Sequence, residues 1–475
     1  MKNTYYITTT LPYVNAKPHI GFALEIVSAD VLARANKLFG KEVFFNTGTD
    51  EHGLKILRKA EELGVSAQEY CNAQAKNFKS LRDLLNVEFD RFIRTTDADH
   101  KEAAQKFWKI CDENGFIYKK NYKANYCVGC ELEKTNSELV DGKCPDHPNA
   151  EIEIIEEENY FFKFSEFGER LLKMYKDNPD FVKPKKRFNE IISFVEQGLQ
   201  DFSISRLKEK MPCGVEVPGD EKHVMYVWFD ALVNYISTLG WPNEEENFKK
   251  WWPGVQFCGK DNLRQQSAMW QAMLMAANLP CSKKVYVNGF INIDGQKMSK
   301  SLGNVISPEE MVQRYGVDAT RYLLLSMGSF GEDADINWAR LDEKFNADLA
   351  NGIGNLTSRV ITLYKKAEFD LDFEKSKRKP FVDNIELEKS LDEGRFGDEI
   401  TRIMKLVQEL DRSIEQQKPW ELIENEPEAF RESIEGLARG VYFIGLKLKP
   451  FMPETSESIV NSLEEKNKVK LFPRL

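Results

Sequence analysis

The sequence has little of what a membrane or exported protein needs. No stretch of its 475 residues approaches the roughly 20 consecutive apolar residues that a membrane-spanning helix requires. The first ten residues, MKNTYYITTT, contain one lysine and no apolar core, so we expect no secretory signal. We therefore expect no membrane association, and the predicted compartment is the cytoplasm.

Histidine is scarce and cysteine is unevenly distributed. Only five histidines occur, at positions 19, 52, 100, 147 and 223. Of the eight cysteines, those at positions 127, 130 and 144 cluster, and the others are scattered. In a large chain without an export signal, this pattern favours thiols and a metal over a disulfide framework.

Positive charge is in deficit. The formal net charge is −10, which argues against broad nonspecific binding to nucleic acid but leaves room for a local basic face. Hydrophobic residues make up 42% and charged residues 30%, as in a globular protein. The length exceeds what one core supports, so about two to four domains are expected.

The N-terminal part has the strand–helix–strand order of a doubly wound α/β sheet. Residues 4–13, TYYITTTLPY, are β-rich and end in a proline-containing loop. From Pro18 to Leu38 apolar residues recur at helical spacing, and Gly40 ends this predicted helix. Residues 41–53, KEVFFNTGTDEHG, indicate a second strand and its loop. This order predicts a parallel sheet of the Rossmann type.

The character of the chain changes between residues 116 and 223. Short segments, the cysteine cluster and the acidic run EIEIIEEEN predict an insertion there. Strand-like segments resume in residues 224–290, a loop and linker occupy 291–343, and helical periodicity dominates from 344 to 475. We therefore predict a sheet built from residues 1–115 and 224–290, split by the insertion and followed by an all-α domain.

The cysteine cluster has the spacing of a zinc site. Two residues separate Cys127 from Cys130, which gives the pattern C-x2-C. Two residues also separate Cys144 from His147, which gives a second pair, C-x2-H. Three thiolates and one imidazole match a closed tetrahedral zinc site, which anchors a small insertion that lacks a core of its own. All four positions are filled by protein ligands, so the predicted zinc is structural rather than catalytic.

Two short polar segments have the composition of phosphate-binding loops. PHIG, residues 18–21, lies where a strand gives way to a helix, and a helix N-terminus attracts phosphate. DGQKMSKS, residues 294–301, places Lys297 and Lys300 in a glycine-flanked loop that suits closure over a polyphosphate. Each segment alone also fits a simpler interpretation, a helix start or a charged surface turn.

Together, PHIG and KMSKS resemble the two signature motifs of class I aminoacyl-tRNA synthetases. The further stretches TLPYVNAKPHIG, TGTDEHG, YVWFDALVNY, GKD, FNADLANGIGNL and KPW are similar to the methionyl-tRNA synthetase family, over nearly the whole chain. The resemblance implies that methionine and ATP form an adenylate with release of pyrophosphate, with Mg²⁺ accompanying ATP. It also implies that methionyl is then transferred to tRNA(Met) and that the all-α domain binds the anticodon.

The resemblance assigns site residues by motif position. The residues expected to bind methionine are Leu11, Tyr13, Asp50, Trp228, Ala231, Tyr235, Gln266 and Trp270. The expected ATP-binding residues are His19, Gly21, Gly259, Asp261, Lys297 and Lys300, of which His19, Lys297 and Lys300 are the expected catalytic residues. Asn355, Arg359 and Trp420 are the expected anticodon-reading residues. A carboxylate suits the ammonium group of methionine, and aromatic faces suit its thioether.

Two positions depart from the family pattern. The first signature usually ends in a second histidine, and here that position holds Phe22, which cannot donate a hydrogen bond to phosphate. Gln266 stands where the family commonly has a pocket histidine, and its amide can still form hydrogen bonds. The chain ends shortly after the helical domain, without the appended tRNA-binding module of some relatives, so a monomer is expected.

Two other functions are considered. One is a different class I synthetase, for leucine, isoleucine, valine or cysteine. The insertion leaves little room for the editing domain of the large-aliphatic enzymes. The other is an RNA-binding paralogue that has lost catalysis, which Phe22 favours and which the presence of His19, Asp50, Asp261 and both lysines opposes.

Overall fold

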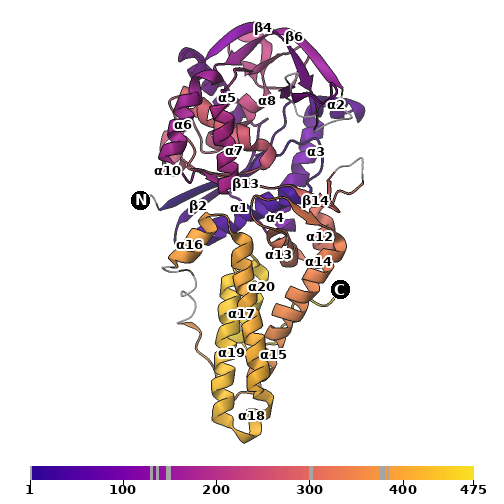
Figure 1. Cartoon of the computed structure of the whole chain (residues 1–475), viewed down its shortest axis with the longest axis vertical. Helices are drawn as coiled ribbons and strands as arrows, with labels where there is room; N and C mark the ends of the chain where they lie inside the picture. The colour runs from indigo at the N-terminus through magenta and orange to yellow at the C-terminus, as the bar shows by residue number, and fades with distance from the viewer. Residues whose placement is uncertain are drawn as a thin grey trace.

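The computed structural model describes residues 3–128, 132–134, 138–145, 151–298, 303–374, 381 and 384–475. The first part of the chain forms an α/β unit, at the top of Figure 1, and the last part forms a tapering group of helices below it. Three of the predicted site residues, Cys130, His147 and Lys300, lie outside the described ranges. Within those ranges, no helix has both the length and the apolar character needed to cross a membrane.

A parallel sheet of six strands forms the centre of the α/β unit, in the order β3-β2-β1-β12-β13-β7. Its strands are β1 (Thr4–Thr8), β2 (Glu42–Thr49), β3 (Arg91–Arg94), β7 (Val182–Lys183), β12 (Val255–Gly259) and β13 (Lys284–Asn288). Strand β1 pairs with β2 on one side and with β12 on the other, all in parallel. The strand order therefore reverses at β1, and in such sheets ligands bind beyond the carboxyl ends of the strands at that point.

The two faces of the sheet carry separate hydrophobic cores. Neighbouring residues of one strand alternate between them, since Ile7 belongs to the core under α1 and Tyr6 to the core under α5. The same alternation separates Tyr286 from Val285 on β13. This alternation follows from the two-residue period of a strand, and it makes the sheet the middle layer between two layers of helices.

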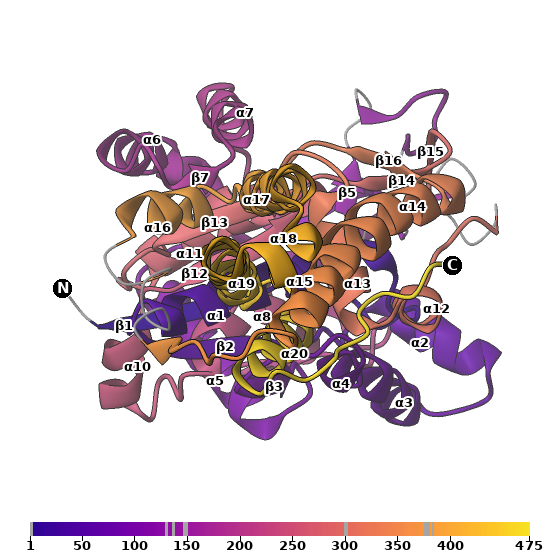
Figure 2. The ribbon, with the colours of Figure 1, turned by 90° about the horizontal axis from the view of Figure 1, so that it is seen from below.

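The helices of the α/β unit pack on both faces of the sheet, as the view from below in Figure 2 shows. They are α1 (Ile20–Leu38), α2 (Leu54–Glu62), α3 (Ala67–Lys79), α4 (Leu81–Leu84), α5 (Ala98–Glu113), α6 (Gly168–Asp177), α7 (Lys185–Glu196), α8 (Val227–Ala231), α9 (Asn234–Ser237), α10 (Glu245–Trp251) and α11 (Trp270–Ala276). Helix α1 begins at Ile20, later than the sequence pattern indicated, because the side chain of His19 caps it.

The segment predicted as an insertion forms two small antiparallel sheets and one strand of the central sheet. The first sheet contains β4 (Ile117–Cys127), β5 (Leu132–Lys134), β6 (Ile152–Phe162) and β8 (Phe202–Ser203). The second contains β9 (Ser205–Leu207), β10 (Glu216–Val217) and β11 (Asp220–Met225). One further strand of this segment, β7, belongs to neither small sheet and pairs with β13 at the edge of the parallel sheet. A strand of two residues has too little periodicity to be found in a sequence.

The linker contains a small sheet of three strands and two helices, and the C-terminal region is helical, as the periodicity of residues 344–475 predicted. The linker contains β14 (Ile291–Ile293), β15 (Gln296–Lys297), β16 (Ala334–Ile336), α12 (Pro308–Tyr315) and α13 (Val317–Ser326). The helices that follow are α14 (Trp338–Lys344), α15 (Asn355–Tyr364), α16 (Ile385–Asp392), α17 (Phe396–Gln417), α18 (Pro419–Asn425), α19 (Pro427–Leu448) and α20 (Pro453–Glu464). Helix α18 lies at the far tip in Figure 1.

A buried ion pair joins the two parts of the molecule. The guanidinium of Arg321 on α13 lies 2.7 Å from the carboxylate of Asp30 on α1, and both side chains are fully buried. Arg321 also donates to the backbone carbonyls of Leu85, Pro450 and Phe451. One side chain thus connects α1, the end of α4 and the chain before α20, and it fixes the helical region against the sheet.

Candidate active site

The two predicted phosphate-binding segments meet at the start of α1. The backbone N–H of Ile20 donates to the carbonyl of Ile306, at 3.2 Å, just beyond the KMSKS segment. A Cβ atom at Gly21 would lie 3.9 Å from the methyl carbon of Met298, the methionine of KMSKS. Segments far apart in the sequence therefore share one site at the carboxyl edge of the sheet.

His19 occupies the N-cap of α1. Its Nδ1 accepts a hydrogen bond of 3.0 Å from the backbone N–H of Gly21, and its imidazole is exposed. A Cβ atom at Gly21 would lie only 2.7 Å from Cε1 of that ring. Glycine at this position therefore leaves the space that the imidazole occupies. The helix end directs its free N–H groups and positive dipole toward the same region.

Lys297 lies across the site from α1, on β15. Its ammonium packs 4.8 Å from the centre of the Phe290 ring, and the ammonium of Lys260, in the GKD motif, packs on the same ring at 4.2 Å. Lys260 is also paired with Asp333 at 2.6 Å. The structure thus brings the exposed Lys297 close to the GKD loop, while its predicted companion Lys300 lies outside the described residues.

Gly259 and Asp261 lie at the end of β12, the strand next to β1. A Cβ atom at Gly259 would lie 2.5 Å from Oδ1 of Asp261, so the carboxylate folds back over the glycine. The strand end and the short turn that follows (Lys260–Asn262) place Asp261 at the point where the strand order reverses. A carboxylate at that point can accept hydrogen bonds from ligand hydroxyls.

Asp50 is held in a rigid loop directly after β2. Its backbone N–H donates to the carbonyl of Pro12 at 3.1 Å, and its own carbonyl accepts from the N–H of Val14 at 3.2 Å. These two bonds place Tyr13 beside Asp50, as a parallel bridge between them shows. The thiols of Cys71 and Cys213 donate to the carbonyls of Glu51 and Gly53 in the same loop. The loop therefore has little freedom, and its carboxylate is almost fully buried.

Tyr235, Gln266 and Trp270 form one buried group behind the loop. The rings of Tyr235 and Trp270 lie 5.9 Å apart, and Gln266 donates to the Tyr235 hydroxyl at 2.5 Å. The side chain of Gln256 in turn donates to the side-chain amide oxygen, Oε1, of Gln266 at 3.1 Å. Gln266 belongs to a π-helical turn, Gln265–Met269, a feature that is frequent at functional sites.

The other predicted methionine-binding residues occupy less enclosed positions. Leu11, Tyr13 and Trp228 are half-buried, and Ala231 lies on α8 in the same turn as Trp228. Within the described part of the chain, the indole nitrogens of Trp228 and Trp270 are buried without a hydrogen-bond partner. Trp270 is fully buried against Phe107 as well, so it contributes to the core in addition to any role at the site.

Sequence reasoning missed Glu25, a buried carboxyl group at this site. Its Oε1 accepts hydrogen bonds from Thr10, at 2.8 Å from the backbone N–H and 2.6 Å from the hydroxyl. Burial raises the pKa of Glu25 to about 7, the bonds from Thr10 oppose this, and the nearby Asp261 adds to it. A glutamate on the buried face of an apolar helix is the sequence signal that identifies such a group.

Phe22 does not face the phosphate side of α1. Its ring packs edge-on against Phe78 of α3, with 5.6 Å between the ring centres, and it belongs to the core under α1. The position of the missing second histidine is therefore filled by a core aromatic residue. Phe22 contributes packing rather than a hydrogen-bond donor at this end of the site.

The structure describes two of the four predicted metal ligands, Cys127 and Cys144. Cys127 ends β4 and pairs in register with Leu132, and Cys144 follows a short bridge between Val140 and Lys143. Both cysteines are fully buried. Cys130 and His147 lie outside the described residues, and the residues that are described contain no group of three potential metal ligands. The zinc site therefore stays a prediction.

Two of the predicted anticodon residues meet near the tip of the helical region. The guanidinium of Arg359 on α15 lies 5.8 Å from the centre of the Trp420 ring on α18. Arg359 is also paired with Asp411 and Glu415 of α17. Trp420 is 40% exposed, an unusual state for a tryptophan. Asn355 is exposed one helical turn before Arg359 on α15.

Comparisons with known proteins agree with this geometry. The family described as tRNA synthetases class I (M) matches residues 5–153 and 148–361. A methionine–tRNA ligase of Caldanaerobacter subterraneus is 43% identical over 98% of this chain and 74% of its own length. One of Nostoc sp. is 41% identical over 97% of this chain and 90% of its own length.

A solved structure has the same fold over the full length. It is Mycobacterium tuberculosis methionyl-tRNA synthetase in complex with methionyl-adenylate, which is 35% identical and superposes with a TM-score of 0.90. The comparison covers 100% of this chain and 97% of the other. The free form of the mycobacterial protein superposes with a TM-score of 0.84.

Proposed function

The chain belongs to the class I tRNA synthetases (M), and we propose that it activates methionine with ATP and transfers methionyl to the 3′ end of tRNA(Met). It is an aminoacyl-tRNA ligase, like the relatives that match it over most of their length. The observation that carries the proposal is the meeting of PHIG and KMSKS, through Ile20 with Ile306 and Gly21 with Met298, next to the Asp50 loop.

In the first step, a carboxylate oxygen of methionine attacks the α-phosphorus of ATP and pyrophosphate leaves. No covalent bond to the enzyme is needed, so the residues act by positioning and by electrostatic stabilisation. Asp50 holds the ammonium group, and His19, Lys297 and Lys300 face the phosphates. Gly21 leaves room at the helix tip, and Gly259 and Asp261 hold the ribose. Mg²⁺ bound to ATP shares the phosphate charge.

The methionine side chain occupies the group formed by Tyr235, Gln266 and Trp270. A polarizable thioether packs well against aromatic faces, and two of these three side chains are aromatic. Leu11, Tyr13, Trp228 and Ala231 complete the enclosure from the β1 loop and from α8. The buried indole N–H of Trp228, which has no partner within the described residues, supports a ligand on that side.

In the second step, a ribose hydroxyl of the tRNA terminus attacks the carbonyl carbon of the adenylate and AMP leaves. Asn355, Arg359 and Trp420 read the anticodon, where unpaired bases offer a face for stacking and edges for hydrogen bonds. The exposed ring of Trp420 beside the Arg359 guanidinium supports this role. Their location near the far tip of the helical region keeps the two ends of the tRNA at separate sites.

We propose one structural zinc ion in the insertion, held by Cys127, Cys130, Cys144 and His147. The two described ligands fit such a site, because their thiol groups are fully buried, Cys127 at the end of β4 and Cys144 just after the Val140–Lys143 bridge, and thiolates suit zinc. Elemental analysis of the purified protein is expected to give one zinc per chain and less in Cys144→Ser. Full zinc occupancy in that variant contradicts the assignment.

A monomer located in the cytoplasm, with methionine, ATP and tRNA(Met) as its partners, completes the proposal. Sedimentation of the purified chain is expected to give the mass of one copy, and a concentration-independent dimer would overturn that part. The cytoplasmic location stays a prediction from the sequence.

The experiment for the proposed function is ATP–pyrophosphate exchange with each amino acid in turn, followed by charging of tRNA(Met). Exchange is expected with methionine and not with leucine, isoleucine, valine or cysteine. Exchange with another amino acid would favour a different class I synthetase. Binding of tRNA without any exchange would favour a paralogue that has lost catalysis.

A further inference from the structure

Asp230 on α8 holds two imidazoles in the interior of the α/β unit. Its Oδ2 lies 2.5 Å from Nδ1 of His52, and its Oδ1 lies 2.8 Å from Nε2 of His100. The other ring nitrogen of His100 lies 2.9 Å from the hydroxyl of Ser237. Asp230 and His100 are fully buried, and His52 is almost so. Three segments distant in sequence, around residues 52, 100 and 230–237, thus meet in one polar network.

We propose that the His52–Asp230–His100 network positions the Asp50 loop for the ammonium group of methionine. This inference rests on the proposed function. It concerns three residues that act through Asp50 and α8, so they are positioning residues and not catalytic ones.

The network joins two walls of the proposed methionine site. His52 follows Asp50 by two positions, and its backbone N–H points to Oδ1 of Asp50 at 3.5 Å. Asp230 lies on α8 between Trp228 and Ala231, two of the proposed methionine-binding residues. The bond between His52 and Asp230 therefore ties the loop that holds the ammonium group to the helix that lines the side-chain pocket.

The carboxylate of Asp230 is ionised in the network. Burial acts to raise the pKa of Asp230, but the two imidazoles outweigh it and lower the pKa to about 2. An ionised buried carboxylate is costly unless it is paired, so the two imidazoles are needed to hold it in place.

The ionisable groups that surround the network are either paired with an opposite charge or neutral. Glu51, next to Asp50, is paired with Arg94 at 2.7 Å, and Thr49 and Thr96 donate to it. Burial raises the pKa of the Cys71 thiol to about 12, so it stays neutral, and the Cys213 thiol donates to a carbonyl.

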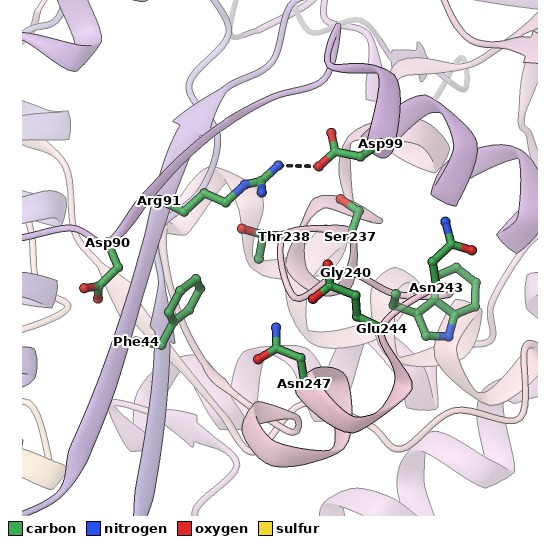
Figure 3. Close-up of a pocket in the computed structure, with 11 residues that line it drawn as sticks. Phe44, Asp90, Arg91, Asp99, Ser237, Thr238, Gly240, Asn243, Glu244 and Asn247 are labelled. Atoms are coloured by element: carbon green, nitrogen blue, oxygen red, sulfur yellow. Dashed lines mark hydrogen bonds and ion pairs between the residues drawn. The ribbon is translucent and has the colours of Figure 1, made fainter.

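A cavity lies at one end of the network. Ser237, with Arg91 and Asp99, lines this cavity of about 350 Å³, and Figure 3 shows Arg91 paired with Asp99 in it. Asp90 and Glu244 also line it. The Ser237 end of the network therefore borders a cavity, whereas the His52 end borders the Asp50 loop.

Loss of the bond between His52 and Asp230 is expected to act on methionine binding and not on ATP binding. The KM for methionine is expected to rise, because the loop that holds the ammonium group is then no longer tied to α8. The KM for ATP is not expected to follow, because ATP is held at α1 and the KMSKS segment.

The test compares the KM for methionine with the KM for ATP in the exchange reaction of each variant. His100→Ala removes a hydrogen-bond partner of Asp230, and His100→Gln keeps a donor to it, so a smaller rise in the KM for methionine is expected in His100→Gln. Asp230→Asn is expected to raise the KM for methionine about tenfold or more. The matched control is His223→Gln, because His223 is paired with Asp220 at 3.0 Å in the insertion.

Histidine resonances of the wild type, recorded with and without methionine by NMR, test the inference without any variant. A methionine-dependent shift of two buried histidines supports it. An unchanged KM for methionine in Asp230→Asn, equal changes in both KM values, or the same KM for methionine in His223→Gln as in His100→Ala overturns it. Absence of methionine-dependent exchange in the wild type would instead overturn the proposed function.

Discussion

The side chain of Gln266 donates a 2.5 Å hydrogen bond to the hydroxyl of Tyr235, and both residues are almost completely buried. Gln256 completes the chain by donating to the same amide. The amide therefore fixes the orientation of an aromatic ring that we propose as part of the methionine pocket. When a buried hydroxyl or a buried amide is left without its hydrogen-bond partner, the free energy of unfolding falls by about 1–3 kcal/mol for each unpaired group.

The first prediction follows from this pair. Gln266→Leu removes the donor to Tyr235 and the acceptor for Gln256, so we expect a higher KM for methionine and a lower urea midpoint. Gln266→His supplies one donor and one acceptor, so a smaller loss is expected. Tyr235→Phe in the Gln266→Leu background measures how much of the effect passes through the hydroxyl. Equal methionine KM values in the wild type and Gln266→Leu contradict the assignment.

The second prediction concerns the tip of α1. In Gly21→Ala the new methyl group lies 2.7 Å from the His19 ring, so the imidazole has to move. We expect the exchange rate to fall about 100-fold while the fold persists, because small displacements at a reacting centre are costly. Gly436→Ala is the matched control, because a Cβ atom there meets nothing within 4 Å. A normal exchange rate in Gly21→Ala contradicts the role of His19.

The third prediction is a pH dependence of stability due to Glu25. Its pKa is raised from 4.5 to about 7 by burial, against the two bonds from Thr10. Between pH 4.5 and about pH 7, the carboxyl group of Glu25 is protonated in the folded protein and ionised in the unfolded chain. The free energy of unfolding therefore falls as the pH rises through this window.

Glu25→Gln keeps an oxygen for Thr10 and removes the ionisation. We expect it to be more stable than the wild type at pH 8, by on the order of 1–3 kcal/mol, and similar near pH 4.5. Urea denaturation at both pH values measures the difference. A stability difference that does not change with pH sinks this prediction.

The fourth prediction concerns the junction between the two parts of the molecule. Arg321→Met removes a buried cation from Asp30 and the donors to the backbone carbonyls of Leu85, Asn86, Pro450 and Phe451. We expect a loss of about 3–5 kcal/mol in the free energy of unfolding, measured in urea. Arg314→Ala breaks the exposed pair with Asp342 and is the control, with little change expected. Similar losses in both variants contradict the prediction.

The fifth prediction separates the two proposed steps. Trp420→Ala and Arg359→Ala are expected to raise the KM for tRNA(Met) about tenfold in the charging reaction, because stacking on a base is worth about 1–3 kcal/mol. Methionine-dependent exchange needs no tRNA and is expected to be unchanged. Ile385→Ala, at an exposed position of the helical region, is the control. Loss of exchange in Trp420→Ala shows a folding defect instead of a tRNA contact.

The sequence by itself determined the parallel α/β core, the helical C-terminal region and the family. Strand and helix periodicity depends on local repeats of two and 3.6 residues, and PHIG and KMSKS keep their form as short motifs. A serine and a glutamate three residues apart, Ser307 and Glu310, also indicate a capping box at a helix start, and the structure contains it.

Only the tertiary structure decided which distant groups share an environment. The short edge strand β7, the buried Glu25 beside Asp261, the core position of Phe22, and the two imidazoles on Asp230 each depend on packing between segments far apart in the chain. Desolvation and pairing set the charge of a buried group, and both depend on neighbours in space. A linear sequence specifies those neighbours only through the fold.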